Sequence, residues 1–167
     1  NLFLPEPFDG SPLPTVPVWL SDLLPVWVST FTDGNWGFGS RGHHGGRSDG
    51  QLEKITINGK SFQHSLGTHP RSGEGGRVIY EVGGRYSRFE GSVGITDQPG
   101  LSATAITFEI LGDEKSLWQS GSIRKSGELT GFDIDLTGVK KLQLEVHCPG
   151  SNHAACAVWI EPTLRPA

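Results

Sequence analysis

The sequence predicts an all-β protein, built as a two-sheet antiparallel β-sandwich of the jelly-roll type. Short β-forming segments follow one another along the chain, and each is bounded by Gly, Asn, Asp or Ser. Within the longer segments, apolar and polar residues alternate with the period of two that indicates a half-buried strand. No window of eleven or more residues shows the apolar stripe of a helix. Many short strands separated by turn residues are typical of sandwiches and jelly rolls.

The chain begins with a proline-rich segment over residues 1–17. Proline fixes φ and removes a backbone donor, so this segment predicts an extended N-terminal arm, followed by a single domain over residues 18–167. Two short apolar runs with β character come next, at 18–20 and 26–28. Residues 32–50 are expected to form one long loop, and loops of that length in a compact domain are commonly functional.

The rest of the domain is expected to be a series of strands. Asn58-Gly59 predicts a type I′ hairpin turn, because both residues tolerate positive φ. Leu142, Leu144 and Val146 alternate with polar residues, as expected of a strand with one buried face. The predicted strands are Ile55–Ile57, Val78–Val82, Arg88–Ile95, Thr104–Leu111, Leu117–Gln119, Phe132–Leu136, Leu142–Cys148 and Ala157–Ile160.

Composition and motifs exclude several classes of function. The formal net charge is −4 and no basic stripe is present, so no nucleic-acid partner is expected. No apolar run approaches the roughly 20 residues of a membrane span, so no membrane partner is expected. Gly37-Phe-Gly39-Ser-Arg-Gly42 matches a dinucleotide fingerprint, but the His-His-Gly-Gly that follows cannot start the required helix. Asp133 and Asp135 lie on one strand face, unlike paired glycosidase carboxylates, so no enzymatic activity is predicted.

Sugar binding requires an aromatic surface and planar polar groups, presented by loops at one end of a rigid scaffold. The loops of this chain offer Trp36, Arg47, His69, Arg71, Glu74, Asn152 and His153 as candidate carbohydrate-binding residues. Each also has a structural interpretation: Trp36 as a loop anchor on the core, His69 as a buried hydrogen-bonded histidine, and Asn152 as a loop cap. Both interpretations are open at the level of sequence.

Cys148 and Cys156 are the two cysteines of the chain. In an oxidising compartment they would close a short loop, which is worth about 2–3 kcal/mol in the chain-entropy model. Such a disulfide would stiffen the segment that carries Asn152 and His153, and it would indicate export. The alternative is two buried thiols that act as small apolar side chains.

A set of motifs in fixed order also carries a family resemblance. The motifs are Trp19-Leu-Ser-Asp22, Asn35-Trp-Gly37, Leu66-Gly-Thr-His69, Gly83-Gly-Arg-Tyr86, Val93-Gly-Ile-Thr-Asp97 and Asn152-His-Ala154. Together they resemble the NPCBM family of carbohydrate-binding modules, which is related to the family 51 carbohydrate-binding modules. The resemblance extends from about Pro17 to Leu164 and implies a galactose-binding-domain-like β-sandwich. It also implies a non-catalytic module that recognises glycans, with galactose-type sugars as the first expectation.

The resemblance further implies partners, a location and a cofactor. The module would target a larger secreted protein, and a covalently linked catalytic domain, to glycans outside the cell or in the periplasm. Trp36 would stack on the sugar, and polar groups on either side would bond its hydroxyls. Modules of this architecture often hold a structural calcium, for which Asp33, Asp49 and Asp97 are the candidate ligands.

The chain departs from the family near its C-terminus. Relatives tend to have Asp-His-Ala-Asp-Trp-Ala-Asp where this chain has Asn152-His-Ala-Ala-Cys156-Ala-Val158. This difference bears on specificity more than on fold. The alternative function is an architectural or protein-interaction β-sandwich that packs on an enzyme and binds no sugar, with the proline-rich arm suited to such packing.

Overall fold

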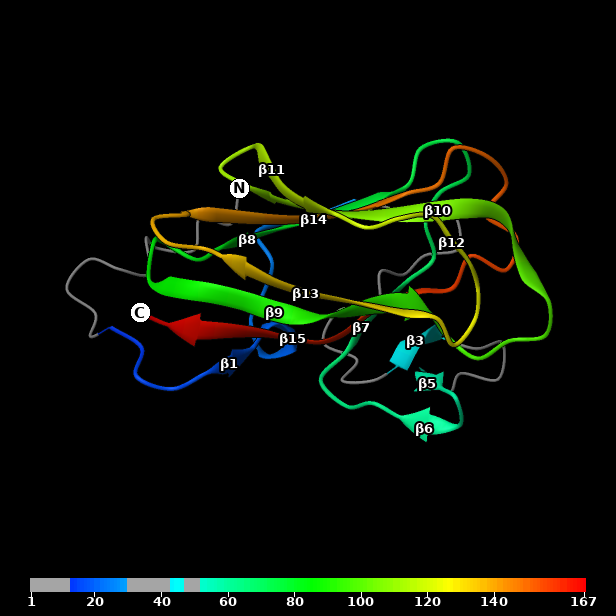
Figure 1. Cartoon of the computed structure of the whole chain (residues 1–167), viewed down its shortest axis with the longest axis horizontal. Helices are drawn as coiled ribbons and strands as arrows, with labels where there is room; N and C mark the ends of the chain where they lie inside the picture. The colour runs from blue at the N-terminus through cyan, green and yellow to red at the C-terminus, as the bar shows by residue number, and fades with distance from the viewer. Residues whose placement is uncertain (1–12, 30–42, 47–51) are drawn as a thin grey trace.

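The computed structural model describes residues 13–29, 43–46 and 52–167 of the chain. Two antiparallel sheets pack face to face, which confirms the predicted all-β sandwich (Figure 1). Sheet A consists of β1 (Val18–Trp19), β7 (Leu66–Thr68), β9 (Tyr86–Ile95), β13 (Leu129–Asp135) and β15 (Ala157–Pro166). Its strands run in the order β1-β15-β9-β13, and β7 also pairs with β15.

Sheet B forms the second layer. It consists of β2 (Trp27–Val28), β8 (Gly76–Glu81), β10 (Leu101–Gly112), β11 (Lys115–Gln119), β12 (Ile123–Lys125) and β14 (Lys141–His147). The order is β11-β10-β14-β8-β2, and β12 pairs with β10. Two hairpins, β3 (His43–Gly46) with β4 (Leu52–Lys54) and β5 (Thr56–Ile57) with β6 (Lys60–Ser61), and a 3-10 helix η1 (Leu20–Asp22) complete the described elements. None of the helical structure in the described ranges is long and apolar enough to cross a membrane.

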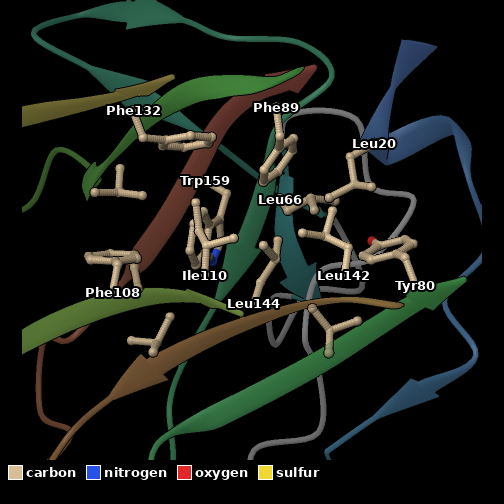
Figure 2. Close-up of a cluster of buried hydrophobic side chains, with 14 of the residues drawn as sticks. Leu20, Leu66, Tyr80, Phe89, Phe108, Ile110, Phe132, Leu142, Leu144 and Trp159 are labelled. Carbon is tan, nitrogen blue, oxygen red and sulfur yellow. The ribbon is translucent and has the colours of Figure 1, made fainter. Parts of the chain in front are cut away.

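The core lies between the two sheets (Figure 2). Phe89, Phe132 and Trp159 project from sheet A toward Phe108 and other apolar side chains of sheet B. Phe108 and Trp159 meet edge to face, with ring centroids 5.3 Å apart. The predicted alternation is confirmed, since the core also receives Ile106 and Ile110 from β10, Leu142, Leu144 and Val146 from β14, and Val93 and Ile95 from β9.

The β5–β6 hairpin covers part of the outer face of sheet A. Asn58 and Gly59 have φ of 50° and 74°, as the predicted type I′ turn requires. Ile55 and Ile57 beside this turn pack on Val158 and Ile160 of β15 in a second apolar cluster. Strand β15 is therefore buried on both of its faces over this stretch.

Several strand predictions require correction. Residues 43–46, expected within a long loop, form β3, because their backbone pairs with β4 despite the two glycines. Leu20, expected in a β-type run, begins the 3-10 helix. Strand β15 continues to Pro166, beyond the predicted end at Ile160. Glu161, at φ 45°, lies at an irregularity in the pairing between Ile160 and Thr163, after which the ladder resumes.

Three further strands were not predicted, β4, β7 and β12, each of three residues. All three are too short to show a period of two, so pairing with a neighbouring strand defines them and local sequence does not. Residues 13–17, the described part of the predicted arm, have no helix or strand, and β1 begins at Val18. The rest of the predicted arm lies outside the described residues.

Candidate functional site

Two loops at one end of the sandwich lie side by side (Figure 1). The loop at 69–75 leads from β7 to β8, and the loop at 148–153 leaves β14 toward β15. His69 Nε2 donates to the carbonyl oxygen of Asn152 at 2.8 Å, and Asn152 Nδ2 donates to the carbonyl oxygen of Pro70 at 2.8 Å. The backbone N–H of Asn152 donates to Ser72 Oγ, also at 2.8 Å. These reciprocal bonds fix the two loops to each other.

The 69–75 loop also passes very close to strand β14 at Gly75. A Cβ atom at this position would lie 2.1 Å from the carbonyl oxygen of Val146, and φ is +98°. Only glycine fits such a conformation and such an approach. Arg71 and Gly75 exchange backbone hydrogen bonds in both directions, which closes a tight turn that holds Arg71 and Glu74 at its rim.

A cleft of about 400 Å³ opens beside this turn on the outer face of sheet B. The turn contributes one wall, and strands β2, β8 and β14 contribute the rest. The side chains that line the cleft include Trp27, Arg71, Glu74, Arg77, Glu145 and His147. The cleft therefore combines an exposed indole with planar hydrogen-bonding groups, the combination that sugar binding requires.

Charged groups in the cleft are paired with opposite charges. Arg71 Nη1 lies 3.4 Å from Glu74 Oε2, and Arg77 Nε lies 3.4 Å from Glu145 Oε1. The Arg77 guanidinium also lies over the Trp27 ring, 5.3 Å from the ring centroid. Arg77 and Glu145 are directly opposite each other in the ladder between β8 and β14, so the backbone register sets this pair.

In the cleft, His147 Nε2 donates to Glu109 Oε1 at 2.9 Å and lies 3.5 Å from Glu145 Oε2. Hydrogen bonds from Ser116, Gln119 and His147 lower the pKa of Glu109, against the raising effect of burial. Within the described ranges, Glu109, Glu145 and His147 are the one group of His, Cys, Asp or Glu side chains whose ligand atoms all lie within 4.8 Å. Hydrogen bonds account for the arrangement without a metal.

Comparison with protein families adds the deciding observation. Residues 17–165 match the NPCBM/NEW2 domain. This chain belongs to that family. The resemblance seen in the sequence motifs is confirmed, and with it the assignment of the chain to the carbohydrate-binding modules.

Solved structures share the fold of this NPCBM/NEW2 chain. A CBM51 module from Clostridium perfringens GH95, in complex with methyl-galactose, has a TM-score of 0.64 at 21% identity and covers 89% of this chain and 99% of its own. The tandem CBM51 modules of a family 98 glycoside hydrolase from Streptococcus pneumoniae have a TM-score of 0.68 at 23% identity, over 90% of this chain and 47% of theirs.

A curated relative of the NPCBM/NEW2 chain is much longer than the chain itself. It comes from Renibacterium salmoninarum and is named for endo-alpha-N-acetylgalactosaminidase activity. The two are 28% identical over 151 residues, which is 90% of this chain and 9% of the relative. The chain thus matches one small part of that protein.

The structure brings together five of the predicted sugar-binding residues of the NPCBM/NEW2 module. His69, Arg71, Glu74, Asn152 and His153 all lie on the two connected loops, and Arg71 and Glu74 reach the cleft. The His69 ring and the Asn152 amide both bond loop backbone, which is the structural interpretation considered above, while His153 is exposed. Predicted residues Trp36 and Arg47 lie outside the described part of the chain.

The structure describes one of the three predicted calcium ligands, Asp97. Asp33 and Asp49 lie outside the described residues. Asp97 accepts hydrogen bonds from the backbone N–H groups of Asn58 and Gly59, at 2.8 and 2.7 Å, and so holds the β5–β6 turn. The calcium site stays a prediction.

Both cysteines are thiols in this structure. Cys148 is buried, and its Sγ donates toward the carbonyl oxygens of Gly150 and Ser151 at 3.5 and 3.6 Å. Burial raises the pKa of the Cys148 thiol, which opposes formation of the reactive thiolate. The thiol supports the 148–153 loop from inside, and the disulfide stays a prediction about an oxidising environment.

The strand carboxylates of β13 have structural partners. Asp133 forms an ion pair with Arg88 at 2.7 Å, and Asp135 accepts a hydrogen bond from the backbone N–H of Thr137 at 2.8 Å. These contacts agree with the interpretation of Asp133 and Asp135 as the exposed face of a strand.

Sequence reasoning missed four cleft residues, Trp27, Arg77, Glu145 and His147. Trp27 lies in a short apolar run of the sequence, and the other three residues fall on the polar positions of strands, where exposed charged residues are ordinary. The one available signal was that Glu145 and His147, two residues apart on a predicted strand, must share a face. The order of strands in the sheet decides which strands lie beside that face of β14. The alternation of apolar and polar residues does not specify this order.

Proposed function

We propose that this module binds neutral, galactose-type sugars at the end of the sandwich where the 69–75 and 148–153 loops meet, and that it does so without catalysis. The observation that carries the proposal is the cleft beside these loops, which combines an exposed indole with Arg, Glu and His side chains. Membership of the NPCBM/NEW2 family makes a glycan the expected ligand class.

Relatives support this choice of sugar. One structurally similar CBM51 module is described in complex with methyl-galactose, and another, from Clostridium perfringens ZmpB, in complex with GlcNAc. The curated relative is named for an enzyme that acts on N-acetylgalactosamine linkages. Methyl-galactose and N-acetylgalactosamine both contain a galactose-configured ring. Methyl-galactoside is therefore the first ligand to test.

The predicted residues divide into two roles in this proposal. His69 and Asn152 position the loops, because their polar side-chain groups bond loop backbone. Arg71, Glu74 and His153 contact the sugar, together with Trp36 and Arg47 of the 30–51 segment. We also propose that Asp33, Asp49 and Asp97 hold a structural calcium ion.

The proposed biological role is targeting. The chain matches 9% of one relative and 47% of a tandem-module structure, so a module of this kind works as part of a larger polypeptide. We infer a secreted or periplasmic parent protein with a linked catalytic domain, which the module would hold near its glycan substrate.

A glycan array tests the proposal directly. The purified domain is applied with calcium and with a chelator, beside the His153→Ala and Trp36→Ala variants. Selective binding to galactose-type glycans, weakened by either substitution at unchanged thermal stability, is the expected result. A folded domain that binds no glycan in either condition would overturn the proposal.

One observation favours the alternative, an architectural module that packs on a neighbouring domain. Leu13, Val16 and Leu24 in the N-terminal segment are 71%, 63% and 76% exposed. Apolar side chains at such exposure suit a contact with another protein surface. A glycan array without signal, together with stable binding to the adjoining domain of the parent protein, would establish this role.

A further inference from the structure

We propose that the sugar lies on the outer face of sheet B, with Trp27 as its stacking surface and Arg77, Glu145 and His147 as its hydrogen-bonding partners. This inference rests on the proposed function and specifies it, because it extends the sugar site from the loops onto the strands β2, β8 and β14. None of these four residues belongs to the loop motifs that suggested a sugar site.

Trp27 is the aromatic group that the described part of the cleft supplies. It lies on the short edge strand β2, opposite Ile79 of β8, and it is 47% exposed. The apolar C–H face of a pyranose packs on an indole in the same way that other apolar groups do, by removing both surfaces from water. The guanidinium of Arg77 over the same ring limits the ring's freedom before the ligand arrives.

The polar partners stand on strands and are held before binding. Glu145 and His147 are two residues apart on β14 and therefore share its outer face. Glu145 is only 17% exposed and contacts both Arg77 and His147. Side chains fixed by paired strands keep their geometry better than loop side chains, which favours hydroxyl recognition at this face.

Charge in the cleft favours a neutral sugar over a sialylated or sulfated one. The two arginines, Arg71 and Arg77, each lie 3.4 Å from a carboxylate, Glu74 and Glu145 respectively. An anionic sugar would have to compete with these carboxylates for the guanidinium groups. The volume of about 400 Å³ falls at the lower end of the range for small-ligand sites, as expected for one or two sugar rings.

Isothermal titration with methyl-β-galactoside tests the location of the ligand. The Trp27→Ala variant is expected to bind about tenfold more weakly, the effect of losing roughly 55 Å² of apolar contact. Trp27→Phe, which keeps an aromatic ring, is expected to recover part of this loss. Leu24→Ala is the matched control, because Leu24 is an exposed apolar residue of the same segment that does not line the cleft.

The outcomes separate this inference from the proposed function. Galactoside binding that Trp27→Ala leaves unchanged and His153→Ala abolishes would place the sugar at the loop tips and overturn the sheet-face site, while the proposed function would stand. A parent domain that binds no glycan would instead overturn the proposed function itself. Thermal unfolding of each variant shows whether the fold is intact, and Trp27→Phe keeps the test decisive if Trp27→Ala unfolds.

The Glu145→Gln variant separately tests whether the carboxylate partner of Arg77 makes the cleft prefer a neutral sugar over an anionic one. It keeps the shape of the side chain but leaves Arg77 without its carboxylate partner. The ratio of affinities for a sulfated galactoside and for methyl-β-galactoside is expected to rise by about tenfold or more relative to the parent domain. An unchanged ratio would contradict contact between the sugar and Arg77.

Discussion

The outer faces of the two sheets differ in what covers them. On sheet A, the β5–β6 hairpin packs Ile55 and Ile57 against Val158 and Ile160 of β15. On sheet B, the corresponding face carries Arg77, Glu145 and His147 and opens into a cleft. One sheet therefore has both faces buried over part of its area, whereas the other keeps one face for solvent or ligand.

The residue patterns of strands β15 and β14 account for this difference between the two sheets. Strand β15 begins Ala-Val-Trp-Ile without a polar residue, as expected of a strand buried on two sides. Strand β14 reads Lys-Leu-Gln-Leu-Glu-Val-His, with a polar residue at every second position. The polar side chains of β14 point away from the core and can contact a ligand, because the apolar side chains of the same strand fill the core. A continuous apolar strand such as β15 thus indicates a covered outer face. An alternating strand such as β14 indicates an open one.

The largest expected difference in the free energy of unfolding comes from placing a carboxylate on the outer face of each sheet. Val158→Asp buries a charge in the cluster under the β5–β6 hairpin, where Val158 has no exposed surface. We expect a loss of about 4 kcal/mol or more in the free energy of unfolding, or failure to fold. Thr107→Asp, on the open face of sheet B beside His147, is expected to cost under about 1 kcal/mol. Urea unfolding of both variants measures the difference, and equal losses would contradict the assignment of the two faces.

The next largest loss of stability is expected where the 69–75 loop passes close to β14, at Gly75. Gly75→Ala places a Cβ 2.1 Å from the carbonyl oxygen of Val146, so the loop must move. We expect a loss of roughly 2–4 kcal/mol and weaker sugar binding, because the turn that carries Arg71 and Glu74 shifts.

Gly73→Ala is the matched control for this prediction. Gly73 also has positive φ, of 77°, but no atom lies within 4 Å of the position that a Cβ would take there. Its substitution is expected to cost only about 1 kcal/mol, from backbone strain alone. Thermal unfolding and galactoside titration measure both variants, and an equal effect would show that contact with β14 is unimportant.

The hairpin that covers sheet A is held by Asp97. Asp97→Ala removes the acceptor of two backbone N–H groups, those of Asn58 and Gly59, and is expected to cost about 1–2 kcal/mol. Hydrogen exchange should quicken in β5 and β6 and stay unchanged in β8 and β14. Faster exchange on the open face would contradict the independence of the two faces.

The smallest expected effect concerns the open face at low pH. Hydrogen bonds from Ser116, Gln119 and His147 lower the pKa of Glu109, so the folded state favours its ionised form. The stabilisation from this group is present above the pKa of the unfolded chain and is lost as pH falls through the lower pKa of the folded state. Glu109→Gln should therefore flatten the decline of stability with acid, measured as the unfolding midpoint at several pH values. An acid slope in Glu109→Gln equal to that of the parent domain would contradict the stabilising role of the ionised Glu109 side chain.

Alternation and turn residues were sufficient to predict the sandwich, the type I′ turn and the core positions of β10 and β14. These features depend on local periodicity, which a single sequence displays. Strands β7 and β12 depend on pairing with distant partners, and β15 crosses an irregularity at Glu161, so local patterns did not reveal them. The same reason explains the site: loop residues such as Arg71 and Glu74 were recognisable, whereas Trp27 and Arg77 become neighbours of Glu145 only through the order β14-β8-β2.

The central claim is that the open face of sheet B, together with the adjoining loops, binds the sugar. Titration of the ¹⁵N-labelled domain with methyl-β-galactoside, followed by amide chemical shifts, tests it most directly. The account predicts saturable shifts in β2, in β8 near Arg77, in β14 near Glu145 and His147, and in the 69–75 loop, with β5 and β6 unaffected. Shifts confined to the hairpin face of sheet A, or the absence of any shift from a folded domain at high ligand concentration, would contradict it.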